Sequence, residues 1–202
     1  LLNLVVKKDW QGGEKLPKSG AAIVVCNHLS YIDPLTFTHF LFNSGRAPRY
    51  LGKMGVFNIP IIGRVVRGAG QIPVDRQSPN AAKAYEHAIA VLKAGHLLGV
   101  FPEGTLTRDE NFWPMRGKSG VVKLALLTGA PIIPCAQWGP ERVLPPYSKK
   151  IKLFPRTKIS IRVGEPLDFS KWHGKVDDPI ALEEATDYVM DAITTLLEGI
   201  RG

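Results

Sequence analysis

Residues 21–34 read AAIVVCNHLSYIDP, and this stretch decides the fold. Its first six residues form an unbroken apolar run, which predicts a strand buried on both faces of a sheet. A polar turn follows and ends at Asp33-Pro34, a pair that favours a helix over residues 34–42 with Asp33 as its N-cap. A buried strand that leads through a short turn into a helix is typical of α/β domains.

The same alternation of short apolar runs and amphipathic segments continues along the chain. We predict strands over residues 72–74, 97–101, 131–136 and 157–163, and helices over residues 80–93, 120–127 and from Asp178-Pro179 to about Glu198. The pattern predicts an α/β fold in which one domain, residues 1–202, holds a mixed, mostly parallel sheet flanked by helices.

The composition is that of a globular protein with a core. The chain has 202 residues, of which 45% are hydrophobic and 22% charged, and these values exclude a disordered tail and a coiled coil. Its two cysteines, Cys26 and Cys135, are too few for a disulfide scaffold, which favours a reducing, cytosolic setting. Because the chain begins with Leu1 and not Met, we expect the natural protein to start earlier. Whether an N-terminal membrane anchor precedes Leu1 is left open.

The charge of the chain is positive and unevenly distributed. A net charge of +8 and a pI near 9.6 indicate an anionic partner. Residues 142–162 hold seven basic residues and no acidic one, whereas the acidic C-terminal helix predicted over residues 177–200 holds seven acidic residues. The chain lacks a recognition helix and an RNA-binding motif, so we expect no nucleic acid as a partner.

Within the basic stretch, Lys149, Lys150 and Lys152 follow Pro145-Pro146-Tyr147 and precede Phe154. Cations interleaved with apolar side chains are typical of segments that bind an anionic membrane surface. A solvated surface without a partner is the alternative for these lysines.

His28 and Asp33 lie five residues apart across the polar turn that follows the first strand. This spacing lets the carboxylate approach one imidazole nitrogen, which raises the basicity of the other nitrogen and stabilises the imidazolium. A histidine held by the backbone and an aspartate that only caps the helix form the structural alternative. Cys26 lies two residues before His28, which also suggests a Cys–His nucleophile, but a cysteine at the end of an apolar strand is more often a small core residue.

A second polar segment, Phe101-Pro102-Glu103-Gly104-Thr105, also follows a predicted buried strand. Its carboxylate and the backbone N–H groups beside the glycine suit a phosphorylated polyol, because a carboxylate accepts hydroxyl protons and N–H groups bind phosphate oxygens. The loop after it adds three cations, Arg108, Arg116 and Lys118.

The two segments together resemble the lysophosphatidic acid (1-acylglycerol-3-phosphate) acyltransferases of the glycerophosphate acyltransferase superfamily. Asn-His-x-Ser-x-x-Asp stands at residues 27–33, and Phe-Pro-Glu-Gly-Thr follows about seventy residues later. Two further family blocks are recognisable at residues 70–76 and 130–134. Each departs from the family pattern at one residue, Pro73 in the first block and Ala130 in the second. The loop at residues 106–109 also departs from the family pattern. The resemblance covers about residues 16–163.

The resemblance implies roles for individual residues. His28 is implied as the general base and Asp33 as its orienting partner. The residues implied to hold the glycerol phosphate are Arg76, Glu103, Gly104 and Thr105, with weaker basic positions at Lys53 and Arg116. The implied architecture is an α/β domain that rests on the membrane surface beside an N-terminal helical anchor.

The resemblance also implies the reaction. We expect an acyltransferase of phospholipid biosynthesis that moves a fatty acyl group from acyl-CoA or acyl carrier protein to lysophosphatidate, as a peripheral membrane protein on the cytoplasmic face. No cofactor or metal is expected. Three alternatives remain: another acceptor (a different lysophospholipid, glycerol 3-phosphate or a glycolipid), a hydrolase, and a non-catalytic lipid-binding protein at the membrane surface.

Overall fold

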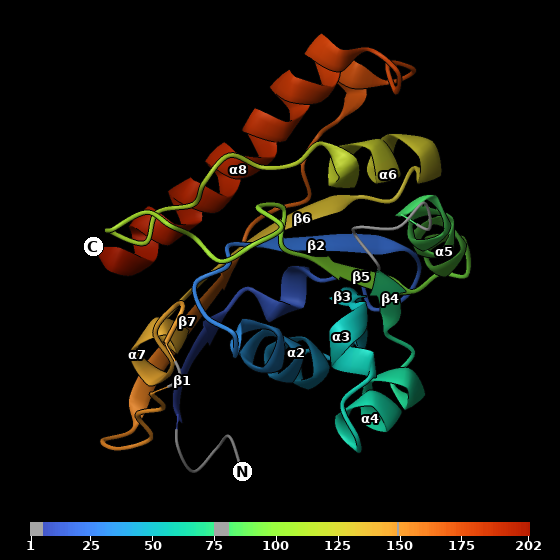
Figure 1. The fold of residues 1–202 in the computed structure, drawn as a ribbon. Coiled ribbons are helices and arrows are strands. Elements are labelled where there is room, and N and C mark those ends of the chain that lie inside the picture. Colours follow the sequence, from blue (N-terminus) through green and yellow to red (C-terminus); the bar gives the residue numbers. More distant parts are fainter. Residues whose placement is uncertain (1–5, 75–80, 149) are drawn as a thin grey trace.

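The structure is a computed structural model that describes residues 6–74, 81–148 and 150–202. These residues form a seven-stranded sheet with the order β1-β7-β6-β2-β5-β3-β4 (Figure 1). Neighbouring strands are parallel except for the antiparallel pair β6–β7, so the predicted mixed, mostly parallel α/β fold is confirmed. The strands are β1 (Val6–Gln11), β2 (Ala22–Cys26), β3 (Pro48–Lys53), β4 (Ile72–Val74), β5 (Leu97–Val100), β6 (Ile132–Trp138) and β7 (Thr157–Val163).

Helices cover both faces of the sheet (Figure 1). On one face lie α5 (Ala81–Lys93), α6 (Gly120–Thr128) and α8 (Pro179–Arg201). On the other lie α2 (Asp33–Asn43), α3 (Met54–Phe57) and α4 (Ile62–Gly68). Three shorter elements complete the described fold: the 3-10 helices η1 (Gly13–Lys15) and η2 (Ser170–Trp172), and α7 (Pro140–Val143).

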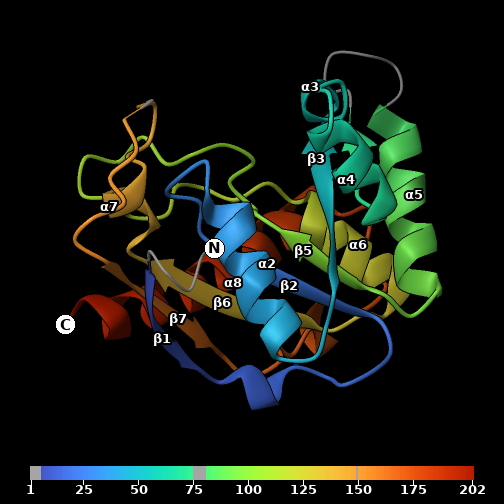
Figure 2. The same cartoon turned by 90° about the horizontal axis from the view of Figure 1, so that it is seen from below.

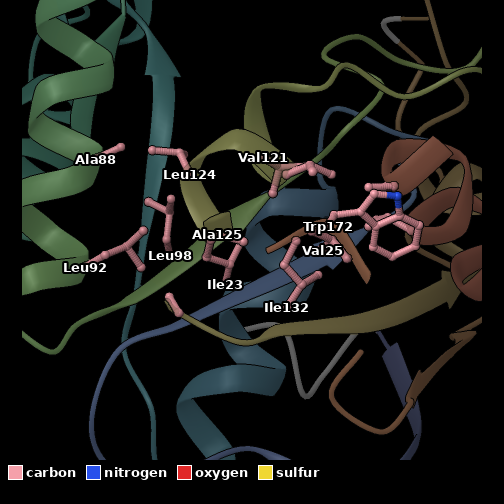
Figure 3. Close-up of a cluster of buried hydrophobic side chains, with 14 of the residues drawn as sticks. Ile23, Val25, Ala88, Leu92, Leu98, Val121, Leu124, Ala125, Ile132 and Trp172 are labelled. Atoms are coloured by element: carbon pink, nitrogen blue, oxygen red, sulfur yellow. The ribbon is translucent and has the colours of Figure 1, made fainter. Parts of the chain in front are cut away.

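Strand β2 lies at the centre of the sheet because every one of its five residues is apolar and fully buried. Its side chains alternate between two hydrophobic cores, as the pleat of a strand requires. Ile23 and Val25 join the core beneath α5, α6 and α8 (Figure 3), whereas Val24 and Cys26 join the core beneath α2. Burying one such aliphatic side chain stabilises a fold by about 1.5–3 kcal/mol, so both cores hold β2 in place.

The strands and helices predicted from the sequence are present, with ends that differ by at most three residues. One detail was wrong: Asp33 is the first residue of α2 and Ile32 occupies the N-cap position. The Asp33 carboxylate faces back to the preceding turn instead of capping the helix. By contrast, the Asp178 side chain accepts the N–H groups of Ile180 and Ala181 and caps α8, as its Asp-Pro pair predicted.

Several elements were not predicted from the sequence, namely β1, β3, α3, α4 and α7. Strand β1 alternates weakly, since its centre is Lys7-Lys8-Asp9, and it is defined by parallel pairing with β7. Helices α3 and α4 are only four and seven residues long, too short for a helical period to stand out. Among the described residues, no helix has both the length and the apolar character needed to cross a membrane.

Candidate active site

The ends of β2 and β5 bring the two polar segments together. Strands β2 and β5 are parallel neighbours, with Val25 opposite Val100 in register. The turn that begins at Asn27 and the turn that begins at Phe101 therefore leave the sheet at the same edge. The carboxyl-terminal edge of a parallel sheet is where α/β proteins place their ligand sites.

His28 and Asp33 form a direct hydrogen bond. His28 Nδ1 lies 2.9 Å from Asp33 Oδ2, and the same oxygen accepts the backbone N–H groups of Leu29 and Ser30. The Asp33 side chain is fully buried, whereas the His28 side chain is 17% exposed. When Asp33 is ionised its carboxylate only accepts hydrogen bonds, so Nδ1 then donates and Nε2 is left to accept a proton.

The environment of Asp33 is dominated by burial. Burial raises the pKa of Asp33 above its ordinary value, and the hydrogen bonds from His28 and the backbone of Ser30 and Leu29 oppose that rise. Its second oxygen, Oδ1, has no hydrogen-bond partner in the part of the chain that the structure describes. A charged imidazolium beside this carboxylate compensates its burial, which is how such a pair stabilises a protonated base.

The ring of His28 is held by stacking. It lies on the ring of Phe101, with centroids 4.3 Å apart and planes inclined by 21°. Phe101 in turn stacks with Tyr50 of β3 and contacts Phe37 of α2. These aromatic contacts fix the plane of the imidazole, so the direction of Nε2 is set by the core of the protein.

Glu103 holds the main chain of His28. Its Oε1 accepts the N–H of His28 at 2.9 Å, and its Oε2 accepts the N–H of Met115 at 3.0 Å. We call this arrangement the Glu103 bridge, because it joins the turn of His28 to the loop before α6. The carbonyl of His28 is held as well, by the N–H of Thr107 at 2.8 Å. Glu103 is buried, which raises its pKa to about 7 despite the two N–H donors.

The predicted glycerol contact of Glu103 stays a prediction, and the bridge is a structural role that the sequence did not indicate. Gly104 and Thr105 follow in the same turn, with Thr105 exposed. Gly104 has a φ of 70°, a backbone conformation that favours glycine, and the end of the Lys118 side chain lies 3.0 Å from the position that a Cβ would take there. The Lys118 side chain therefore lies against this turn.

The other predicted acceptor residues are distributed differently. Lys53 is the last residue of β3 and so ends at the same sheet edge as β2 and β5. Arg116 is exposed and pairs with Glu183 of α8. It lines a cavity of about 580 Å³ between α6 and α8 whose walls do not include His28 or Asp33. Arg76 and Lys149 lie outside the described residues.

A buried amide network behind the catalytic turn was missed from the sequence. The Asn27 side chain accepts the N–H of Gln137 at 2.8 Å and donates to the Gln137 carbonyl at 3.0 Å, so it continues the ladder between β2 and β6. Thr36 in the first turn of α2 donates to Gln137 Oε1 at 3.1 Å. The asparagine before the histidine was the available signal, but its partner is 110 residues away in sequence.

Cys26 belongs to the core. It is fully buried, its position is in register with Cys135 of β6, and both are free cysteines. Burial raises the pKa of the Cys26 thiol well above its ordinary value, which disfavours the thiolate that a nucleophile requires. The site therefore offers a histidine base and no activated cysteine.

Comparisons with known proteins agree with this geometry. A sequence model of the family described as "Acyltransferase" matches residues 8–138. A 1-acyl-sn-glycerol-3-phosphate acyltransferase of Bacillus subtilis is 31% identical over 157 residues, which are 76% of this chain and 70% of that protein. The chloroplastic 1-acyl-sn-glycerol-3-phosphate acyltransferase BAT2 of Brassica napus is 33% identical over 147 residues, 72% of this chain but 41% of the relative.

The fold is also that of a solved structure. The crystal structure of the 1-acyl-sn-glycerophosphate acyltransferase PlsC from Thermotoga maritima superposes with a TM-score of 0.74 at 25% identity, and the match covers 98% of this chain and 74% of that one. The chain spans less than half the length of the plant relatives it matches. With a family match over residues 8–138 and a buried His–Asp pair at the edge of the sheet, the chain belongs to the acyltransferase family.

Proposed function

We propose that this protein transfers a fatty acyl group from a thioester donor to the free hydroxyl of lysophosphatidate and so produces phosphatidate. The observation that carries the proposal is the His28–Asp33 hydrogen bond, which leaves Nε2 as a free base at the edge of the sheet. The choice of lysophosphatidate rests on relatives named 1-acyl-sn-glycerol-3-phosphate acyltransferases.

The proposed mechanism uses one base twice. His28 Nε2 takes the proton of the acceptor hydroxyl as its oxygen attacks the thioester carbonyl, and Asp33 stabilises the imidazolium that results. The tetrahedral intermediate then collapses, the C–S bond breaks, and the imidazolium returns the proton to the departing thiolate. The products are an ester and a free thiol, and no acyl-enzyme forms.

The phosphate of the acceptor requires cations at this edge. Lys53 ends β3 beside β5, and Lys118 lies against the turn of Gly104. We propose that these two residues supply positive charge for the phosphate monoester. Arg76, which lies outside the described residues, stays a third proposed cation on the family resemblance alone. The exposed Thr105 offers a hydroxyl to the glycerol moiety from the same turn.

Lysophosphatidate resides in a membrane, so the enzyme must approach a lipid surface. Lys150 and Lys152 are exposed, as are the side chains of Tyr147 and Phe154. The hydroxyl of Tyr147 donates to the carbonyl of Leu106 at 2.9 Å, which ties this loop to the segment after Glu103. We propose that the loop formed by residues 145–155, with Lys149, binds the anionic cytoplasmic surface of the membrane, where soluble acyl donors are available.

The test is a product analysis with the purified protein. Labelled acyl-CoA and acyl carrier protein are each offered with lysophosphatidate, other lysophospholipids, glycerol 3-phosphate and buffer alone. We expect labelled phosphatidate when lysophosphatidate is the acceptor, and loss of this product with the His28→Ala variant. Thioester cleavage at an equal rate without acceptor would instead identify a hydrolase, and a preference for another acceptor would correct the substrate.

A further inference from the structure

The turn between α3 and α4, together with α4 itself, exposes a group of apolar side chains that the acyl-transfer chemistry does not use. Ile61 is 71% exposed and Val65 is 65% exposed, and Ile59 nearby is also exposed. The N–H of Val65 donates to the carbonyl of Ile61, so these two residues lie one helical turn apart on the same face. Single exposed apolar side chains are common, but a contiguous group of them marks an interaction surface.

The charge of this surface indicates the nature of its partner. Arg64 and Arg67 of α4 are exposed beside the apolar side chains. Apolar side chains flanked by cations complement an anionic lipid surface, which offers acyl chains below a layer of negative headgroups.

The position of α3–α4 matches the other proposed membrane contact. The loop of residues 145–155, the start of α2 and the α3–α4 pair lie on one side of the sheet, with α2 in the middle (Figures 1 and 2). The start of α2 adds exposed Tyr31 and Leu35. The acidic helix α8 lies on the opposite side of the sheet (Figure 1). The apolar and basic groups therefore share one side of the molecule.

We propose that α3–α4 is a second membrane-binding element, in which Ile61 and Val65 insert into the interface of an anionic bilayer while Arg64 and Arg67 contact its headgroups. This inference rests on the proposed function, because it supposes that the acceptor is met in a membrane. Contact at α3–α4 and at residues 145–155 places the bilayer along α2. The hydrogen-bonded turn of His28, which leads into α2, then faces the lipid surface from which the acceptor comes.

The experiment compares three variants of the full chain in sedimentation with vesicles of equal parts phosphatidylcholine and phosphatidylglycerol. The double variant Ile61→Glu/Val65→Glu should bind these vesicles at least tenfold more weakly than the parent protein. Ile61→Ser/Val65→Ser removes the apolar groups without adding charge and should show a smaller loss. The matched control is Ile180→Glu on α8, which changes an equally exposed isoleucine on the opposite side and should bind like the parent.

Activity on a short-chain, water-soluble lysophosphatidate separates this inference from the proposed function. The double variant should keep this activity within about twofold of the parent while it loses activity on vesicle-borne acceptor. If the parent protein acylates no lysophosphatidate, the proposed function is contradicted. If the double variant nevertheless loses vesicle binding, the membrane element still stands. Unchanged vesicle binding of the double variant overturns the inference. If the parent protein is a dimer and the double variant is a monomer, the surface binds a second copy of the chain instead. Loss of activity on the soluble acceptor with unchanged vesicle binding assigns it to an acyl-chain site.

Discussion

His28 and Asp33 carry the proposed chemistry through a single hydrogen bond between Nδ1 and Oδ2. His28→Ala removes the base and should lower kcat by about a hundredfold or more, the usual range for a positioned proton acceptor. Asp33→Asn should act in the same direction, because an amide does not stabilise an imidazolium. Steady-state acyl transfer measures both effects, and circular dichroism checks that the variants fold. Near-normal turnover of His28→Ala would contradict the mechanism.

Glu103 offers a test between two roles, since it was predicted to contact glycerol and it also bridges His28 and Met115. Glu103→Gln leaves one oxygen acceptor and turns an NH₂ group toward the other backbone N–H. If the bridge dominates, kcat should fall about tenfold with lysophosphatidate and with a neutral monoacylglycerol alike, because the main chain of His28 moves. A rise in the KM of the phosphorylated acceptor alone would support the glycerol contact instead.

The pKa of Glu103 also predicts a pH dependence of stability. Burial raises this pKa from 4.5 to about 7, so the folded state binds the proton more tightly than the unfolded chain does. The stabilising contribution is therefore complete below about pH 4.5 and is lost as the pH rises through 7, a change of about 3 kcal/mol. Glu103→Gln cannot titrate and should lack this component. Urea unfolding of both proteins at pH 5 and pH 8 measures it, and an equal pH dependence in the two would refute it.

At the scale of secondary structure, the catalytic turn depends on the junction of β2, β6 and α2. Asn27 satisfies both the N–H and the carbonyl of Gln137, which are buried. Asn27→Ala leaves these two main-chain groups unpaired and should lower the free energy of unfolding by about 3 kcal/mol, since each such group costs about 1–3 kcal/mol. Thr36→Val removes a hydroxyl that lies 3.1 Å from both Gln137 Oε1 and the Asp33 carbonyl, and it should cost about 1 kcal/mol.

Urea denaturation gives both free energies, and the comparison of the two variants is the control. If Asn27→Ala were no less stable than Thr36→Val, the asparagine would not continue the β2–β6 ladder in solution. A lower kcat in Asn27→Ala at a temperature where the variant is folded would show that this junction also positions His28.

Positive charge is concentrated in two segments of the chain. Residues 34–74 and 142–164 together hold 12 of the 26 basic residues and none of the 18 acidic ones. Binding to anionic vesicles should therefore weaken as salt rises, because exposed charges are screened within about 8–10 Å at physiological ionic strength.

Replacing Lys149, Lys150 and Lys152 by glutamate reverses the charge of the predicted membrane loop. Each cation contributes about 1 kcal/mol near an anionic surface, so the triple variant should lose at least a hundredfold in vesicle binding, measured by sedimentation. Activity on a soluble short-chain acceptor should remain. Vesicle binding like that of the parent would make the stretch a solvated surface, and loss of soluble activity would assign the lysines to the phosphates of the acyl donor.

The sequence by itself determined those features that depend on residues close together in the chain. The apolar run of residues 21–26 was sufficient for a central strand, because burial on both faces leaves no room for polar residues. The pairing of His28 with Asp33 was also predictable, since the two residues lie five positions apart in one turn. Asp178-Pro179 marked the start of α8 for the same reason, as a cap acts on the next few residues.

Only the tertiary structure showed which residues far apart in the sequence contact one another. The Glu103 bridge joins groups 75 residues apart, and the Asn27–Gln137 pair joins groups 110 residues apart, so neither leaves a periodic signal in the sequence. Strand β1 is a strand because β7 supplies its hydrogen bonds, although its own residues are mostly polar. Two short motifs supply the chemical groups of the site. The sheet determines its geometry, because it places the strands that precede these motifs side by side.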